Sequence, residues 1–318
     1  MKIKAFAIVA IASLTLMQGM VFGQSHSRTQ PATQRQTQLG GVVQESQQVA
    51  MGQIDHGSWN GLLKKYVDES GAVDYLSWHA SAEDSQALDQ YISGLSFASL
   101  KKPAAIEDQK AYWINAYNAV TIKGILQEYP TTSIRNHTSE TGGYNLWKNL
   151  LLNVGGHQVS LDSMEHKILR PMGDPRIHFA IVCASKGCPR LLNQAYVGQS
   201  LEQQLKVNTT HFFSVAQNFQ YDAANRVFKL SSIMEWFGSD FGADQAAQLA
   251  AISPYLPTAQ AQAAARANAV RVSYLDYSWD LNAQPKKMKQ ANGSGTKDAG
   301  MTKTVGSGMK KVGGSGSR

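Results

Sequence analysis

The sequence predicts an α+β domain in which a mainly antiparallel sheet packs on a buried central helix. Residues 107–129 carry apolar side chains nearly all round a helical pattern, which is typical of a helix enclosed by other elements. Residues 150–161 and 219–230 are each predicted to form two short strands joined by a turn, and the first turn is Gly155-Gly156. Helices and hairpins follow one another without regular β-α-β order, which favours the α+β class.

Two helices precede the central one. Ser58 is a suitable N-cap for the first, which ends near Gly71. A short extended piece at 73–75 leads to the second helix, predicted from 83 to 95. The central helix ends before Pro130, because proline cannot continue a helical hydrogen-bond pattern.

The chain after the first hairpin is predicted to form a short helix that contains Glu165 and His166. Residues 177–184 are a continuous apolar run rich in β-branched side chains, which predicts a strand buried on both faces. Trp236 and Phe237 follow helical spacing and are predicted to pack in the core. The remaining elements are predicted as helices at 200–214, 233–241, 244–252 and 258–268, and a strand at 270–277.

The first residues have the composition of an export signal. Residues 1–23 begin with Lys2 and Lys4, continue as an apolar segment and end in small residues, which predicts a cleaved secretory signal peptide. The alternative is an uncleaved membrane anchor, but polar residues make the segment marginal for a span of about 20 residues. We therefore expect an exported protein, in the periplasm, the cell envelope or the extracellular space, that is not transmembrane after processing.

The rest of the chain is predicted to have three parts. Residues 24–55 are rich in glutamine and are expected to form a disordered leader. Residues 56–285 are long enough for a single domain with one sizeable core. Residues 286–318 form a basic tail rich in Gly, Ser and Lys, which is too polar to fold.

The basic character of the chain comes from its ends. The net charge is +7, yet the tail at 286–318 carries eight Lys/Arg against one acid, and residues 1–23 carry two lysines. The predicted domain is therefore slightly acidic, which argues against specific nucleic-acid binding. The tail is expected either to contact anionic surfaces in a salt-sensitive way or to be a solvated end.

Polar side chains gather in and after the apolar run 177–184. His178 lies near its start, and both cysteines of the chain, Cys183 and Cys188, lie at its end and in the following loop. A buried polar group without a partner costs about 1–3 kcal/mol, so His178 needs a partner or a function. The same loop contains Ser185, Lys186 and Arg190, our candidate binding residues.

The central helix contains two asparagines. Asn115 and Asn118 lie three residues apart and therefore on one face of the helix. Asparagine is a poor helix former, and a buried asparagine needs hydrogen-bond partners. Two compatible roles are open: the pair holds neighbouring loop backbone, or it lines a polar site that faces His178.

Four blocks of the sequence resemble a known family. They are AYWINAYNAVTIKGIL (111–126), VSLDSMEHKILRP (159–171), DPRIHFAIVCASKGCPRL (174–191) and LSSIMEWFGSDF (230–241). They are similar to the hallmark segments of DUF547, a domain of unknown function, and the resemblance covers about residues 105–242. The family is distantly similar to papain-like and transglutaminase-like cysteine hydrolases, which implies that architecture here. Those enzymes carry a cysteine at the start of a buried helix, whereas the central helix of this chain carries Asn115.

The first functional hypothesis is thiol-dependent hydrolysis or acyl transfer on a peptide or protein substrate. Such chemistry needs a thiolate, a base and a group that orients the base. The candidates are Cys183 or Cys188 as nucleophile, His166 or His178 as base, and Glu165, Asn115 or Asn118 as orienting group. In a regular strand His178 and Cys183 face opposite sides, so His166 is the better partner for Cys183. Lys186 and Arg190 would lower the pKa of the thiol.

Two alternatives use the same residues differently. Zinc could be bound by His166, His178, Cys183 and Cys188, although the cysteine spacing is looser than in common zinc sites. Cys183 and Cys188 could instead form a disulfide in an exported, non-catalytic binding or scaffold domain. No cofactor other than zinc is expected, because the sequence lacks a Walker-type loop, a dinucleotide fingerprint and an HExxH motif.

Overall fold

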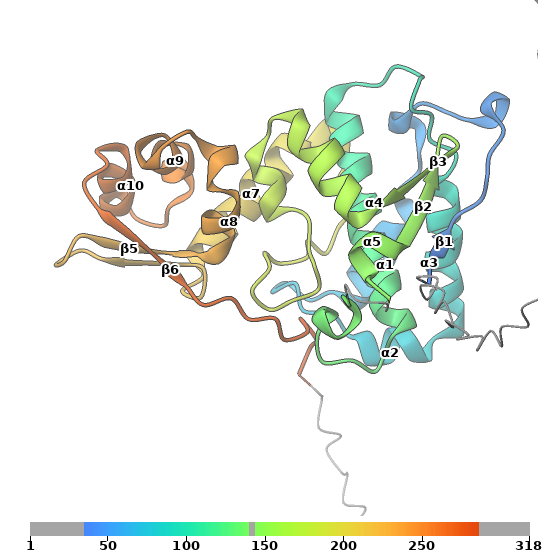
Figure 1. The fold of residues 1–318 in the computed structure, drawn as a ribbon, viewed down its shortest axis with the longest axis horizontal. Coiled ribbons are helices and arrows are strands. Elements are labelled where there is room, and N and C mark those ends of the chain that lie inside the picture. The colour runs from blue at the N-terminus through green and yellow to red at the C-terminus, as the bar shows by residue number, and fades with distance from the viewer. Residues whose placement is uncertain (1–34, 140–143, 286–318) are drawn as a thin grey trace, which may run out of the picture. The chain divides into compact units, whose positions relative to one another are not determined.

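The computed structural model describes residues 35–139 and 144–285. The described residues up to Gln284 form one compact α+β unit, so the predicted class is confirmed (Figure 1). The predicted signal peptide, the leader up to residue 34 and the basic tail lie outside the described residues.

The helix α4 (Ile106–Gln127) forms the centre of the larger part of the fold, as predicted. Its residues from Ala111 to Leu126 are buried almost without interruption. The helices α1 (Gly57–Tyr66), α2 (Tyr75–Ala80) and α3 (Ala82–Leu95) precede it. His56, and not Ser58, occupies the N-cap position of α1.

The described residues contain two small mixed sheets, where one mainly antiparallel sheet was predicted. In the first, β1 (Thr37–Leu39) runs parallel to β2 (Leu150–Val154), which pairs antiparallel with β3 (His157–Ser160). In the second, β4 (Phe219–Asp222) is antiparallel to β5 (Val227–Ser231), which is parallel to β6 (Arg271–Leu275). Both predicted hairpins are therefore correct. Each gains a parallel third strand from a distant part of the chain.

The folded unit begins earlier than residue 56, the predicted start of the domain. Strand β1 pairs along β2, and the side chains of Leu39 and Met51 are buried. Val49 exchanges two backbone hydrogen bonds of 2.8 Å with Phe97 and Ser99. All five residues of β2 are buried, so this strand needs a partner on both edges, and the leader supplies one of them.

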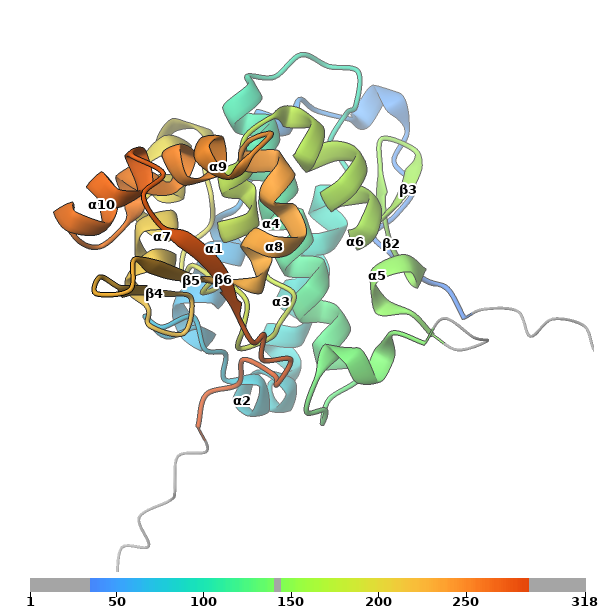
Figure 2. The same ribbon diagram turned by 60° about the vertical axis from the view of Figure 1, so that its left-hand side comes forward.

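Most of the remaining helices lie close to their predicted positions, whereas α5 (Leu146–Asn149) was not predicted. Short helical segments follow the first hairpin at α6 (Leu161–Ser163) and at a π-helix (Met164–Leu169). The others are α7 (Leu201–Ser214), α8 (Ser232–Phe241), α9 (Gln245–Ile252) and α10 (Ala259–Arg266). Figure 1 shows α8, α9 and α10 grouped with the second sheet, apart from α1 to α4, and Figure 2 shows α9 and α10 beside this sheet from a second direction.

The predicted strand at 177–184 is wrong. Residues Pro175–Phe179 form a 3-10 helix, in which the Asp174 carboxylate caps the first turn by accepting from the Arg176 N–H. The chain then continues through residues 180–184 without forming a strand, and Ala184 has a φ of 59°. Instead of a strand, the Asn118 side-chain amide pairs with this backbone: it donates to Ala180 O at 3.0 Å and accepts from Val182 N at 2.9 Å.

The apolar character of this segment has another cause, namely its path between two hydrophobic clusters. Ile177 and Ala180 belong to the large core around α4. Phe179 belongs to a second, phenylalanine-rich core formed by α7, α8 and the second sheet. The segment is therefore buried from both sides, as a central strand would be, but without forming one.

Candidate functional site

A cavity of about 760 Å³ lies where the two cores meet. Five of the predicted catalytic residues line it, namely Glu165, His166, His178, Cys183 and Cys188. The structure thus brings together Glu165 and His166 from the π-helix, His178 from the 3-10 helix, and the two cysteines from the segment that follows it. Ligand sites often lie at such junctions.

The two asparagines of α4 have structural roles and do not line this cavity. Asn118 holds the backbone of Ala180 and Val182. Asn115 holds the backbone of Tyr196: its side-chain amide donates to Tyr196 O at 2.7 Å and accepts from Tyr196 N at 2.9 Å. Both side chains are almost fully buried, and both use their donor and their acceptor on loop backbone. Their contacts therefore agree with the first of the two predicted roles, in which the pair holds neighbouring loop backbone.

The three predicted binding residues also lie off the cavity wall. Ser185 is buried behind the cysteines, with its hydroxyl 3.8 Å from Cys183 Sγ. Lys186 is exposed and lies 3.5 Å from a carboxylate oxygen of Asp280. Arg190 donates to Asn208 Oδ1 at 2.8 Å and to a backbone carbonyl, and burial lowers its pKa. None of these side chains bears a charge next to a sulfur atom.

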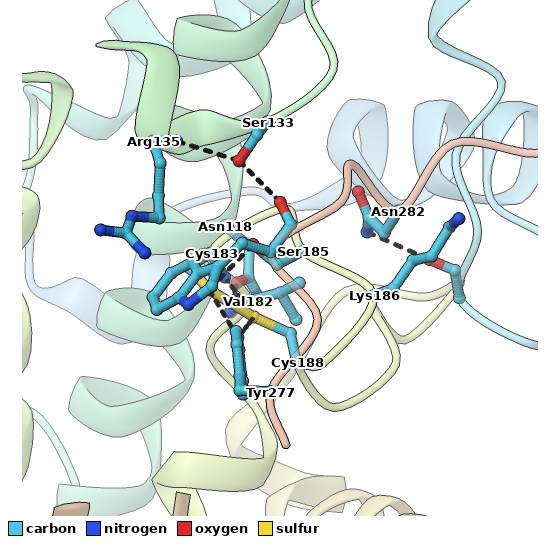
Figure 3. The surroundings of a disulfide bond; sticks show 12 residues. Asn118, Ser133, Arg135, Val182, Cys183, Ser185, Lys186, Cys188, Tyr277 and Asn282 are labelled. Atoms are coloured by element: carbon cyan, nitrogen blue, oxygen red, sulfur yellow. Dashed lines mark hydrogen bonds between the residues drawn. A yellow bond between two sulfur atoms is a disulfide. The ribbon is translucent and has the colours of Figure 1, made fainter. Parts of the chain in front are cut away.

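Cys183 and Cys188 form a disulfide in the cavity wall (Figure 3). The Tyr277 hydroxyl lies 3.1 Å from Cys183 Sγ and 2.9 Å from Cys188 Sγ, and it donates because a disulfide has no proton. The Cys183 N–H also donates to Cys188 Sγ, at 3.1 Å. In the described part of the chain, neither sulfur is hydrogen-bonded to a histidine, so no Cys–His pair is formed in this state.

His178 is buried in the cavity wall and has a carboxylate partner. Its Nε2 lies 2.7 Å from Asp240 Oδ2, and its ring stacks on Phe237 at a centroid distance of 4.1 Å. Burial lowers the pKa of His178, and the Asp240 carboxylate opposes this shift. Asp240 was not among the predicted site residues, although it lies in the fourth family-like block, because nothing in the local pattern pairs it with a histidine.

Asp240 also links the two histidines through Arg170. The Arg170 guanidinium donates to both carboxylate oxygens, each at 2.7 Å, and its Nη1 lies 3.1 Å from His166 Nδ1. These hydrogen bonds, led by those from Arg170, lower the pKa of Asp240 to about 2. Arg170 can only donate, so Nδ1 of His166 is an acceptor and the proton of the neutral ring lies on Nε2.

Glu165 contributes a carboxyl group of different character. Its Oε2 accepts from the Tyr117 hydroxyl at 3.3 Å, and burial raises its pKa. Tyr117 is itself buried, which raises the pKa of its hydroxyl and keeps it a donor. The cavity therefore holds a carboxyl whose pKa is raised and a histidine whose pKa is lowered, a combination found at functional sites.

Aromatic side chains form the outer wall of the cavity. Trp236, Tyr277 and Trp279 contact one another with ring centroids 4.5 to 5.9 Å apart, and Trp147 lies 6.1 Å from Trp279. Trp236 is 46% exposed, so the prediction that it packs in the core is wrong. Its helical spacing correctly indicated α8, but it is on the face of α8 that borders the cavity.

The four proposed zinc ligands do not form a metal-binding group. Within residues 35–139 and 144–285, no set of three or more His, Cys, Asp or Glu side chains could hold a metal ion. The two cysteines are joined to each other and offer no thiolate. None of the helices in these residues has the length and apolar character that a bilayer crossing requires.

The fold and the site define an α+β domain with a disulfide in the wall of an aromatic, partly acidic cavity. The model of the family described as "Protein of unknown function, DUF547" matches residues 102–213, which confirms the resemblance for this segment. The segment contains α4, Glu165, His178 and both cysteines, whereas Asp240 and the wall from Trp236 to Trp279 lie beyond it. No curated protein and no solved structure matches the chain.

Proposed function

We propose that this domain binds a small ligand with an apolar body and a protonated amine, and that the disulfide-lined cavity is the binding site. The supporting observation is the Glu165 carboxyl in the cavity wall, whose hydrogen bond within the described chain comes from Tyr117. A carboxylate has about four acceptor positions, so Glu165 keeps capacity for a ligand N–H.

The charges around Glu165 favour a cationic group. Burial raises its pKa most, and the nearby Asp162, which lines the same cavity, also raises it, whereas His166, Tyr117 and Arg170 lower it. Among the described residues no ion pair reaches Glu165, and the guanidinium of Arg170 is held by Asp240. A ligand ammonium would therefore supply a counter-charge in direct contact with this partly buried carboxylate.

The aromatic wall suits the rest of such a ligand. The electron-rich faces of tryptophan and tyrosine attract cations and bury apolar groups. In this cavity the Arg135 guanidinium already lies over the Trp279 ring, 5.3 Å from its centroid. This contact supports the view that the wall accepts a flat or cationic group.

A fluorescence titration tests this proposal, because Trp147, Trp236 and Trp279 line the cavity. Butylamine is expected to change tryptophan emission saturably, whereas butanol and butyrate are not. Glu165→Gln should weaken butylamine binding at least about tenfold, and the matched variant Glu83→Gln, at an exposed position of α3, should not. Binding of butyrate in place of butylamine would assign the anchoring charge to Arg135 and Lys148 and overturn the proposal.

Thiol-dependent hydrolysis or acyl transfer on a peptide or amide substrate is the second candidate, for the reduced protein. The observation that favours it is that Cys183, His166, His178 and Glu165 share one cavity. A papain-like or transglutaminase-like architecture is part of this proposal. It is supported by the packing of the buried helix α4 against the segment that carries His178 and Cys183, although α4 carries Asn115 and no cysteine.

Separate substitution of the two cysteines distinguishes the candidates. If the protein is an enzyme, only one of the two single variants, Cys183→Ala and Cys188→Ala, should abolish release of amine from a peptide-amide library under a dithiol reductant, and the other should keep this activity. In a binding domain with a structural disulfide, both variants should lose equal stability, about 2 kcal/mol for so short a loop, without any reductant-dependent activity. Export, which we propose from the signal-like first residues, provides the oxidising compartment in which the disulfide forms.

A further inference from the structure

We propose that the Cys183–Cys188 disulfide is redox-active, and that a low-molecular-weight thiol entering the cavity attacks Cys183 and expels Cys188 as the thiolate. This activity goes beyond amine binding and does not depend on it. It would also supply the reduced state that the second candidate function requires.

Access to the sulfur atoms favours Cys183 as the atom attacked. Both cysteines line the 760 Å³ cavity, which is large enough for a small thiol. Cys188 is only 8% exposed, and Cys183 is the more exposed of the two. A thiolate in the cavity therefore reaches Cys183 with less displacement of protein atoms.

Hydrogen-bond donors at the disulfide favour Cys188 as the leaving group. Cys188 Sγ accepts from the Cys183 N–H at 3.1 Å and from the Tyr277 hydroxyl at 2.9 Å. A disulfide sulfur is a weak acceptor, whereas a thiolate is a strong one, so both contacts strengthen when the S–S bond breaks. Burial raises the pKa of Tyr277, so its hydroxyl remains a donor while the thiolate forms.

Backbone hydrogen bonds to residues 278–281 fix the loop between the cysteines independently of the disulfide. Lys186 N donates to Asp280 O and Gly187 N to Ser278 O, both at 2.8 Å, and Ser185 forms a bridge with Leu281. Gly187 also lies flat against Tyr277: a Cβ at this position would come within 2.8 Å of the tyrosine ring. These contacts keep Tyr277 at the sulfur atoms in both redox states.

The exchange takes place in two balanced steps. The incoming thiolate forms a bond to Cys183 Sγ, the Cys183–Cys188 bond breaks, and its electron pair remains on Cys188 Sγ. A second thiolate then attacks the sulfur of the bound thiol and releases Cys183 as a thiolate. Two small thiols are oxidised to their disulfide, and the protein takes up two electrons and, on protonation, two protons.

Reduced glutathione is a suitable probe for the native full-length chain. After acid quench and alkylation, trypsin separates the two cysteines, because cleavage after Arg176, Lys186 and Arg190 leaves them on peptides 177–186 and 187–190. We expect the transient glutathione adduct on peptide 177–186. An adduct on peptide 187–190, or reduction only after the protein unfolds, would overturn the proposal.

The role of Tyr277 is tested by the pH dependence of alkylation of the reduced protein. Tyr277→Phe removes the hydroxyl and keeps the ring, and it should raise the thiol pKa of Cys188 and slow glutathione exchange by about tenfold. Tyr274→Phe is the matched control, since Tyr274 is 43% exposed on β6 and lines a different cavity from the one that holds the sulfur atoms. Equal alkylation profiles for the two variants would remove Tyr277 from the mechanism, and the adduct position in the wild type remains an independent test.

Discussion

The Nε2 atom of His178 lies 2.7 Å from a carboxylate oxygen of Asp240, and 62 residues of sequence separate the two. A carboxylate can only accept, so Nε2 carries the proton and Nδ1 is the basic nitrogen of the neutral ring. Because Arg170 holds the same carboxylate with two hydrogen bonds, Asp240 connects α8 to both segments that carry the cavity histidines.

Asp240→Asn should destabilise the protein, because the amide carries no charge to neutralise Arg170 and can accept at only one of the two positions to which Arg170 donates. We expect a loss of about 1–2 kcal/mol in the free energy of unfolding, since the pair is only partly buried. Urea unfolding measures it. Asp276→Asn, at an exposed position, is the matched control, and equal midpoints for the two variants would show that the Asp240 contacts contribute nothing to stability.

Stability should fall as the pH is lowered through the range in which buried histidines take up protons. Burial lowers the pKa of His56 from 6.5 to about 4, and it lowers the pKa of His178 as well. The unfolded chain therefore binds more protons below pH 6.5, and the stabilisation present above 6.5 is lost as the pH falls towards 4.

His56→Gln should remove much of this dependence. Because each pKa unit is worth about 1.4 kcal/mol, the part of the His56 shift that falls between pH 6.5 and about 5 corresponds to at most about 2 kcal/mol for this partly buried side chain. The glutamine side chain can still contact the Tyr91 hydroxyl, which lies 2.8 Å from His56 Nδ1. Urea midpoints at about pH 7 and 5 measure the effect. If the variant and the wild type lose equal stability, His56 is not the titrating group.

Local sequence patterns predicted most helices and both hairpins, because the information for these elements lies within about 20 residues. The all-round apolar pattern of α4 and the glycine pair at 155 and 156, with φ of 56° and 82°, are of this kind. The parallel pairings of β1 with β2 and of β5 with β6 were missed, since they join segments far apart in sequence.

The part of the site that lies within one short stretch of sequence was predicted, and the part that comes from distant segments was not. Glu165, His166, His178 and the two cysteines lie within a short stretch of sequence, and all five line the cavity. Asp240 and Tyr277 come from later elements, and no periodicity connects them to His178 or to the disulfide. The error at 177–184 has a different origin, because burial between two cores produces the same apolar run as burial in a sheet.

Asn118→Asp should strongly destabilise the protein, although the two side chains are nearly the same size. A carboxylate cannot donate to Ala180 O, and its charge would be buried next to a carbonyl. We expect a loss of about 3 kcal/mol in the free energy of unfolding, together with faster hydrogen exchange at Val182 N. Asn136→Asp, at an exposed position, is the control. Unchanged exchange at Val182 would mean that Asn118 does not hold this backbone.

Amine binding at Glu165 should depend on pH in a defined direction. The pKa of Glu165 is raised from 4.5, mainly by burial, so the empty site binds a proton over a range in which an ordinary glutamate is ionised. A ligand ammonium favours the carboxylate form and displaces that proton, so butylamine affinity should rise with pH until Glu165 is fully ionised. Calorimetry in buffers of different ionisation enthalpy detects the released proton.

His166 and Arg170 also act on this carboxyl, and His166→Gln should shift the pH profile of butylamine affinity without abolishing it. Binding without proton release at any pH in this range would show that the amine does not contact Glu165.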